Sequence, residues 1–95
     1  MPTATIATEW TDSDVAVVAH LRCLLADGSA KEIRERAGLS TVELGRFLGV
    51  EHSTIVRYEA GTLRPSPDLA LQYGRVLAIL QDVLAEDGDA LTTLT

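Results

Sequence analysis

Apolar residues recur at intervals of three and four positions along most of this chain, which is the spacing of amphipathic helices. The first such stretch covers residues 12–26 and stops at Asp27 and Gly28, with Asp12 or Ser13 as the expected N-terminal cap. Its expected inward positions are Val15, Val18, Leu21, Cys23 and Leu25. The pattern therefore predicts a first helix with a wide apolar face.

Two shorter helices are expected next, because two serines each precede a glutamate by three residues. Ser29 and Ser40 can each accept a hydrogen bond from the backbone of that glutamate, whose carboxylate accepts one in return, an arrangement called a capping box. The two helices should cover about 29–37 and 40–48. Their expected inward residues are Ile33, Ala37, Val42, Leu44 and Leu48.

A sharp turn is expected at Gly49, because glycine readily takes the left-handed conformation that ends a helix. Val50 beside it can pack between the two flanking helices. A fourth helix should follow over about 53–59, with Ile55 and Tyr58 three positions apart on its inward face.

The last helix is predicted to begin at Ser66, a capping residue, and Pro67, which fits a first helical turn. Its apolar positions at helical spacing are Leu69, Tyr73, Val76, Leu77, Leu80 and Leu84. Leu71, Ile79 and Val83 widen this stripe beyond one face. Either the first helix or a second copy of the chain should cover the extra apolar positions, and both can do so.

Together these segments predict an all-α chain. With 95 residues, of which 46% are hydrophobic, the chain can form one core and therefore one domain. We expect a flexible N-terminal arm at 1–11, a single domain at 12–88 and a flexible C-terminal tail at 89–95.

Composition and residue spacing argue against several other classes of protein. The longest apolar runs are too short to cross a bilayer, and the first ten residues lack the pattern of a signal peptide, so a cytoplasmic protein is expected. Cys23 is the only cysteine, is expected in the core, and has no zinc-like spacing to His20 or His52. We expect no metal, no cofactor and, without a recognisable catalytic arrangement, no enzymatic activity.

Charge is unevenly distributed along the chain, whose formal net charge is −6. Between residues 31 and 64 six basic residues accompany five acidic ones, whereas the flanks hold two basic residues and nine acidic ones. The middle of the chain can therefore approach DNA while the acidic ends point away. Such a protein gains little non-specific attraction to phosphate.

The stretch from residue 41 onward has the residue types that a helix-turn-helix needs. Two closely crossing helices require a small residue at the crossing, a glycine at the turn and apolar residues that hold the angle. These positions are filled by Leu44, Gly45, Leu48, Gly49, Val50, Ile55, Tyr58, Glu59 and Gly61. Glycine inside a helix costs up to about 1 kcal/mol relative to alanine, so Gly45 is expected to weaken its helix.

Residues Ala30 to about Leu80 resemble the lambda-repressor-like helix-turn-helix domains, also called the Xre family, which includes phage repressors, Cro proteins and many bacterial antitoxins. The resemblance is carried by "RERAGLSTVELGRFLGVEHSTIVRYEAGTLRPSPDL", with its "GLS", "LGV", "YE-G" and "RPS" between and after the helices. It implies a five-helix lambda-repressor-like domain with an extra N-terminal helix and a helix-turn-helix at about 41–59.

The resemblance implies that His52, Ser53 and Arg57 read base edges in DNA. Arg57 is the main candidate, because its planar guanidinium can donate two hydrogen bonds to guanine O6 and N7. His52 can donate to a guanine or a phosphate, and Ser53 discriminates weakly between bases.

Other positions of the resemblance imply contacts without sequence information. Thr41 and Arg64 fall where the family holds DNA phosphate, which sets the register of the protein on the duplex. Thr54 is expected to contact phosphate or a thymine methyl group. Arg34 and Glu59 fall where the family has a structural ion pair. Removing one partner of a buried pair leaves an uncompensated charge and costs about 3–5 kcal/mol.

Two functions follow from these observations. The first is a sequence-specific DNA-binding transcriptional regulator, a small phage or bacterial Cro- or repressor-like protein. It would read an inverted repeat in double-stranded DNA as a homodimer formed through the last helix, the N-terminal helix or both. The alternative is an antitoxin or adaptor whose main role is binding a protein partner, which the acidic flanks, the apolar last helix and Glu51 favour.

Overall fold

The computed structural model describes the chain from Trp10 to Leu94, with side chains as far as Glu86. Five α-helices and no strand occur in this part of the chain, which confirms the predicted all-α fold. They are α2 (Asp12–Ala26), α3 (Ser29–Arg36), α4 (Thr41–Leu48), α5 (His52–Ala60) and α6 (Pro67–Leu94). Most of the expected arm at 1–11 lies outside the described residues.

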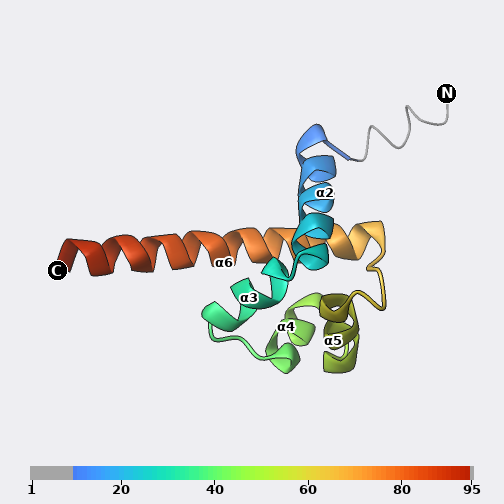
Figure 1. Ribbon diagram of the computed structural model, residues 1–95. Helices are drawn as coiled ribbons and strands as arrows, with labels where there is room; N and C mark the ends of the chain where they lie inside the picture. Colours follow the sequence, from blue (N-terminus) through green and yellow to red (C-terminus); the bar gives the residue numbers. More distant parts are fainter. Residues whose placement is uncertain (1–9, 95) are drawn as a thin grey trace.

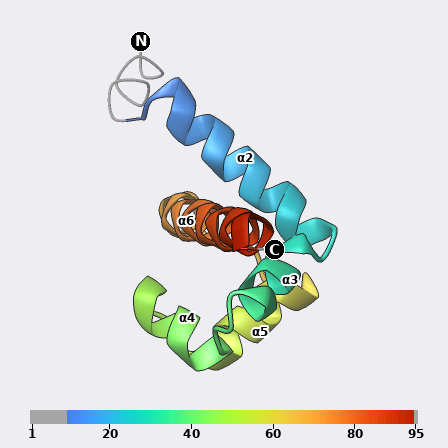
Figure 2. The same ribbon diagram turned by 90° about the vertical axis from the view of Figure 1, so that its left-hand side faces the viewer.

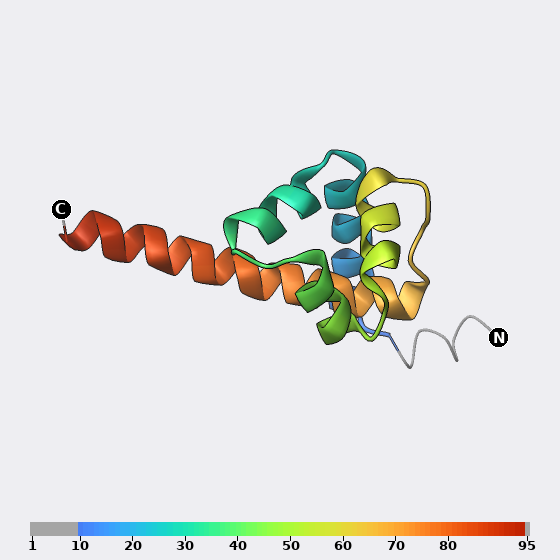
Figure 3. The same ribbon diagram turned by 90° about the horizontal axis from the view of Figure 1, so that it is seen from below.

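The long helix α6 runs through the middle of the molecule and the other helices pack along its first half (Figure 1). Figure 2 looks along α6 and places α2 on one side of it and α4 on the other. The C-terminal end of α6 projects beyond the other four helices (Figure 3). The backbone of residues 89–94, expected as a tail, continues this helix.

All five helices contribute to one hydrophobic core. Its buried members are Val18, Leu21, Ala30, Ile33, Leu44, Leu48, Ile55, Tyr58, Ala70, Tyr73 and Leu77. Most of the positions predicted to face inward on α3, α4 and α5 are among them. Each large side chain that is fully buried contributes about 1.5–3 kcal/mol of stability, so these helices are held mainly by packing.

Two glycines allow pairs of helices to approach closely. A Cβ atom on Gly45 would lie 2.5 Å from the carbonyl oxygen of Val50, and one on Gly74 would lie 2.5 Å from Cγ1 of Val17. Alanine, the better helix former, therefore has no room at this position, and the close approach requires Gly45 whatever glycine costs α4 in helix propensity. Gly74 brings α2 against α6 in the same manner.

Two of the predicted caps are confirmed. The backbone N–H of Glu43 donates to Ser40 Oγ at 3.1 Å, and the N–H of Ser40 donates to Glu43 Oε1 at 3.0 Å. At the start of α6 the N–H of Leu69 donates to Ser66 Oγ at 3.3 Å.

The caps predicted for the first two helices are wrong. The capping box of α2 is formed one residue earlier, by Thr11 and Asp14. Ser29 does not cap α3, because left-handed Gly28 links α2 and α3 so tightly that Ser29 is already the first helical residue. Its N–H instead donates to Asp27 Oδ1 at 2.8 Å.

Three residues predicted to be buried are exposed, namely Val15, Cys23 and Val42. In α2, Val18 and Leu21 are buried and Leu24 and Leu25 pack partly against the core, whereas Val15 and Cys23 lie outside this face. In α4, Val42 lies away from the face that buries Leu44.

Candidate nucleic-acid interface

The turn between α4 and α5 has the geometry of a helix-turn-helix. Gly49 adopts a φ of 73°, and the N–H of Val50 donates to the carbonyl oxygen of Gly45 at 2.9 Å, which closes the end of α4. The chain reaches α5 after only two further residues. Leu48 and Ile55 are buried on the inner faces of the two helices, so the angle between the helices is held by the core.

One face of α5 is exposed and carries the residues predicted to read bases. His52, Ser53 and Arg57 are all exposed, whereas Ile55 and Tyr58 are buried on the opposite face. The structure therefore brings the three predicted base-reading residues onto a single accessible surface. Buried Ile55 and Tyr58 hold that surface in one orientation.

Val56 was not singled out in the sequence, although it lies on the same face of α5. It follows Ser53 by three positions and His52 by four, and 49% of its surface is exposed. An apolar side chain at this place can contact the methyl group of a thymine. The helical spacing from His52 was the signal that could have identified it.

A buried ion pair joins α5 to α3. Arg34 donates from Nε to Glu59 Oε2 at 2.6 Å and from Nη2 to Oε1 at 3.0 Å. Its Nη1 donates to the carbonyl oxygen of Leu39 at 2.8 Å, which also fixes the connection between α3 and α4. The side chains of Arg34 and Glu59 are only 10% and 5% exposed, and the hydrogen bonds to Glu59 raise the pKa of Arg34.

Tyr73 of α6 completes the buried surroundings of α5. Its ring lies 6.1 Å from that of Tyr58 between centroids, at a tilt of 50°. Burial raises the pKa of Tyr73 far above its ordinary value, and the charge of Glu59 adds to this effect. Its hydroxyl has no hydrogen-bond partner among the described residues, so Tyr73 contributes to the core through the packing of its ring.

The family of the chain follows from its match to a known family model. A model described as "Helix-turn-helix domain" matches residues 30–86, which is more than half of the 95 residues. The chain belongs to this helix-turn-helix family. The match confirms the resemblance to Xre- and Cro-type DNA-binding domains, and α2 lies outside it. No curated protein and no solved structure matches the chain significantly.

Membership of this family indicates a DNA-binding regulator, and such domains are typically not enzymes. Within the described residues no helix is long and apolar enough to cross a membrane. The same part of the chain has no cluster of three or more side chains suited to hold a metal ion.

The residues predicted to contact phosphate lie at separate places in this helix-turn-helix protein. Thr41 is the first residue of α4 and is half-buried, and Thr54 is half-buried in the first turn of α5. Arg64 is exposed in the loop between α5 and α6, where it lines a pocket near the C-terminal end of α5. His52 lies at the opposite end of that helix.

Carboxylates flank the starts of both helices of the motif. Glu51, the residue before α5, is exposed and makes no side-chain capping bond. Glu43 is held in the capping box of α4, where the hydrogen bond from the backbone of Ser40 lowers its pKa. The ends of α4 and α5 that would approach DNA therefore carry negative charge, which reduces attraction to phosphate that lacks specific contacts.

Proposed function

We propose that this helix-turn-helix protein is a sequence-specific transcriptional regulator that reads an inverted repeat in double-stranded DNA as a homodimer. The observation that carries the proposal is the exposed face of α5, on which His52, Ser53 and Arg57 lie together while Ile55 and Tyr58 anchor the helix. A helix held in this way can enter the major groove as a rigid unit.

Within this proposal the three side chains have different roles. Arg57 donates two hydrogen bonds to a guanine, a contact that separates bases by about 1–3 kcal/mol. His52 donates to a guanine or a phosphate, and Ser53 contributes a weaker preference. Thr41, Thr54 and Arg64 hold phosphate and set the register on the duplex.

An exposed apolar stripe on α6 supports a homodimer. Ile79 and Val83 are four positions apart on this helix and are 61% and 43% exposed, so they form an apolar stripe outside the core. Exposed apolar stripes of this kind are typical of surfaces that meet another chain. A dimer that places two copies of α5 about 34 Å apart would read half-sites one turn of DNA apart.

The test is a selection of bound fragments from a random double-stranded DNA pool at low salt, with the wild-type chain, Arg57→Ala and Arg36→Ala in parallel. Arg36 is exposed on α3, so its substitution removes the same charge away from α5. We expect the wild type and Arg36→Ala to enrich one inverted repeat. Arg57→Ala should lose preference for one guanine in each half-site.

Two outcomes would contradict the proposal. If Arg57→Ala enriches the same sequence with the same guanine preference as the wild type, Arg57 does not read a base in the major groove. Absence of enrichment by the folded wild type would favour the adaptor or antitoxin function, in which α6 binds a protein partner.

A further inference from the structure

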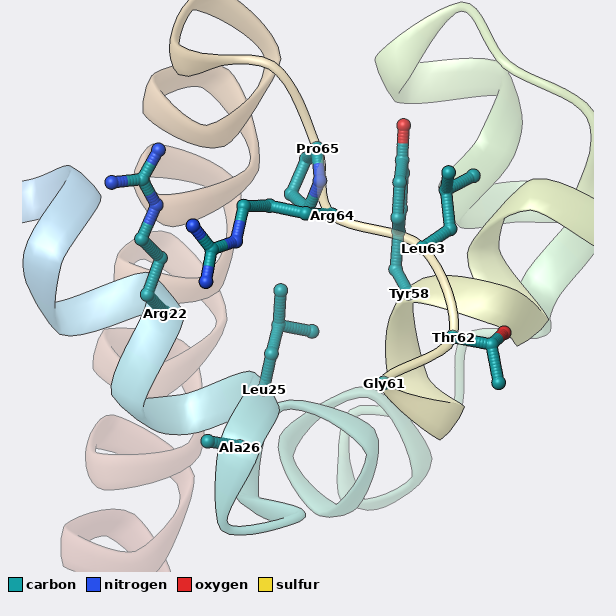
Figure 4. A pocket seen from close by; sticks show the side chains of 9 residues that line it. All are labelled: Arg22, Leu25, Ala26, Tyr58, Gly61, Thr62, Leu63, Arg64 and Pro65. Carbon is teal, nitrogen blue, oxygen red and sulfur yellow. The ribbon is translucent and has the colours of Figure 1, made fainter.

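A pocket of about 370 Å³ lies between the C-terminal half of α2, the end of α5 and the loop that follows it (Figure 4). This volume is within the range of roughly 300–1,000 Å³ that is typical of small-molecule sites. The pocket depends on α2, the helix that lies outside the family match. It is therefore a feature that the helix-turn-helix motif alone does not contain.

The floor of the pocket is apolar. Leu25 and Ala26 of α2 line it from one side, and Tyr58, Leu63 and Pro65 line it from the other. Tyr58 and Pro65 are buried in the fold, whereas 41% of the surface of Leu63 is exposed. An apolar ligand body could thus bury surface here against a largely preformed wall.

Two arginines lie at the α2 side of this pocket. Figure 4 shows the side chain of Arg64 extending from the loop across Leu25, toward the side where the Arg22 guanidinium lies. No acidic residue lines the pocket, although the chain contains 14 acidic and only eight basic residues. Neither Arg22 nor Arg64 forms an ion pair with any described residue.

Among the described residues two of the seven arginines form ion pairs, and Arg22 and Arg64 are not among them. Arg34 is bound to Glu59, and Arg75 of α6 donates to Asp14 of α2 at 3.0 Å. Arg22 and Arg64 instead bring two positive charges to one apolar pocket without an acidic partner. A carboxylate in the pocket can pair with these guanidinium groups, because its two oxygens suit their planar fork of donors.

We propose that this pocket binds a small organic acid, with its carboxylate between Arg22 and Arg64 and its apolar body on Leu25, Leu63 and Pro65. The apolar floor favours this ligand over a bare phosphate or sulfate, which has no apolar part to bury. The ligand class is therefore a monocarboxylate with a short aliphatic or aromatic tail.

The site has a consequence for regulation that rests on the proposed function. Arg64 is there assigned to DNA phosphate, and a carboxylate in the pocket would compete for the same guanidinium. Such a ligand would weaken DNA binding without touching the base-reading face of α5.

The experiment is a titration of the full ¹⁵N-labelled chain, followed by backbone amide chemical shifts, with hexanoate, hexanamide and sulfate as probes. Hexanamide has the same apolar body as hexanoate without its charge, and sulfate has charge without the body. We expect hexanoate to shift the amides of Leu25, Ala26 and Leu63 with a dissociation constant on the order of 1 mM. Hexanamide and sulfate should each bind at least about tenfold more weakly.

Three variants locate the site. Arg22→Gln and Arg64→Gln should each weaken hexanoate binding about tenfold. Arg46→Gln should leave it unchanged, because Arg46 is an exposed residue of α4 that does not line the pocket. Unchanged amide shifts elsewhere establish that each variant is folded. Equal binding of hexanamide or sulfate, or unchanged hexanoate binding by Arg22→Gln, would overturn the proposal.

A DNA-binding measurement in the presence of hexanoate separates this site from the proposed function. Hexanoate at ten times its dissociation constant should weaken DNA binding severalfold relative to the same concentration of chloride. Arg22→Gln, which binds hexanoate more weakly, should reduce this effect to about twofold or less at the same hexanoate concentration. If the chain binds hexanoate but no DNA, the proposed carboxylate site stands and the proposed DNA-binding function is contradicted. Hexanoate binding without any change in DNA affinity would overturn the regulatory consequence alone.

Discussion

Two close contacts in this protein, α4 with the turn before α5 and α2 with α6, both depend on a glycine but differ in what the glycine faces. At Gly45 the nearest atom to an added Cβ is the backbone carbonyl oxygen of Val50. At Gly74 it is a methyl carbon of the Val17 side chain, with the Val17 carbonyl oxygen at 3.1 Å. A backbone atom cannot move without shifting the turn, whereas a side-chain methyl group can be removed by substitution of Val17.

This difference separates a rigid motif from an adaptable attachment. The helix-turn-helix is held by backbone contact and by the buried pair of Arg34 and Glu59. Helix α2 is held on α6 by side-chain packing and by an exposed ion pair between Asp14 and Arg75, of a kind that adds little stability. A DNA-reading surface needs the first kind of support, because its orientation must be defined before binding.

The largest effect on stability is expected from breaking the buried ion pair between Arg34 and Glu59 in the helix-turn-helix motif. Glu59→Ala should lower the free energy of unfolding by about 3–5 kcal/mol, because it leaves the Arg34 guanidinium buried and uncompensated. Urea unfolding measures this loss. The double variant Arg34→Met/Glu59→Met, which removes both charges, should recover most of the stability, and a Glu59→Ala cost below about 1 kcal/mol would contradict a buried pair.

The next effect concerns the crossing at Gly45. Gly45→Ala should destabilise the protein by about 2–3 kcal/mol, since the added methyl group meets the Val50 carbonyl and overpacking outweighs the gain in helix propensity. Urea unfolding again gives the value. Truncating neighbouring side chains should not restore the lost stability, because the clash is with a backbone atom. A Gly45→Ala variant more stable than the wild type would show that the turn can shift to accommodate the methyl group.

A smaller effect is expected at the second crossing. Gly74→Ala should cost about 1 kcal/mol, because the added methyl group meets a side chain and the gain in helix propensity offsets part of the overpacking. The double variant Val17→Ala/Gly74→Ala should be more stable than the sum of the two single changes predicts. An equal cost for Gly74→Ala and Gly45→Ala would mean that α2 is attached as rigidly as the motif.

The smallest effect compares the two capping boxes as a function of pH. Hydrogen bonds from the backbones of Thr11 and Ser40 lower the pKa of Asp14 and of Glu43 below their ordinary values of 3.8 and 4.5. A carboxylate with a depressed pKa in the folded state contributes stability that is complete above its unfolded pKa and is lost as pH falls through the folded one.

Unfolding measured by urea between pH 7 and pH 2.5 tests this expectation. Asp14→Asn and Glu43→Gln should each be less stable than the wild type at pH 7 and should approach it at low pH. A constant difference across this range would show that the carboxylate charge does not contribute through these caps.

Much of the motif could be predicted from the sequence because its signals are local. The Ser40 box, the left-handed turn at Gly49 and the inward positions Ile55 and Tyr58 depend on residues within one or two helical turns of each other. Such contacts form within one helix or one turn, whatever part of the chain packs against it. The exposed placement of His52, Ser53 and Arg57 then follows from helical geometry.

The sequence by itself thus determined the helices, their order and the outward face of α5. Only the tertiary structure decided that Cys23 and Val42 are exposed, that Ser29 does not cap α3, and that Arg22 and Arg64 line one pocket. The spacing of apolar residues predicts that a helix has an apolar face, but the neighbouring elements against which the helix packs decide how much of that face is buried. Residues 42 positions apart in the chain share a pocket because α2 and the loop after α5 meet in space.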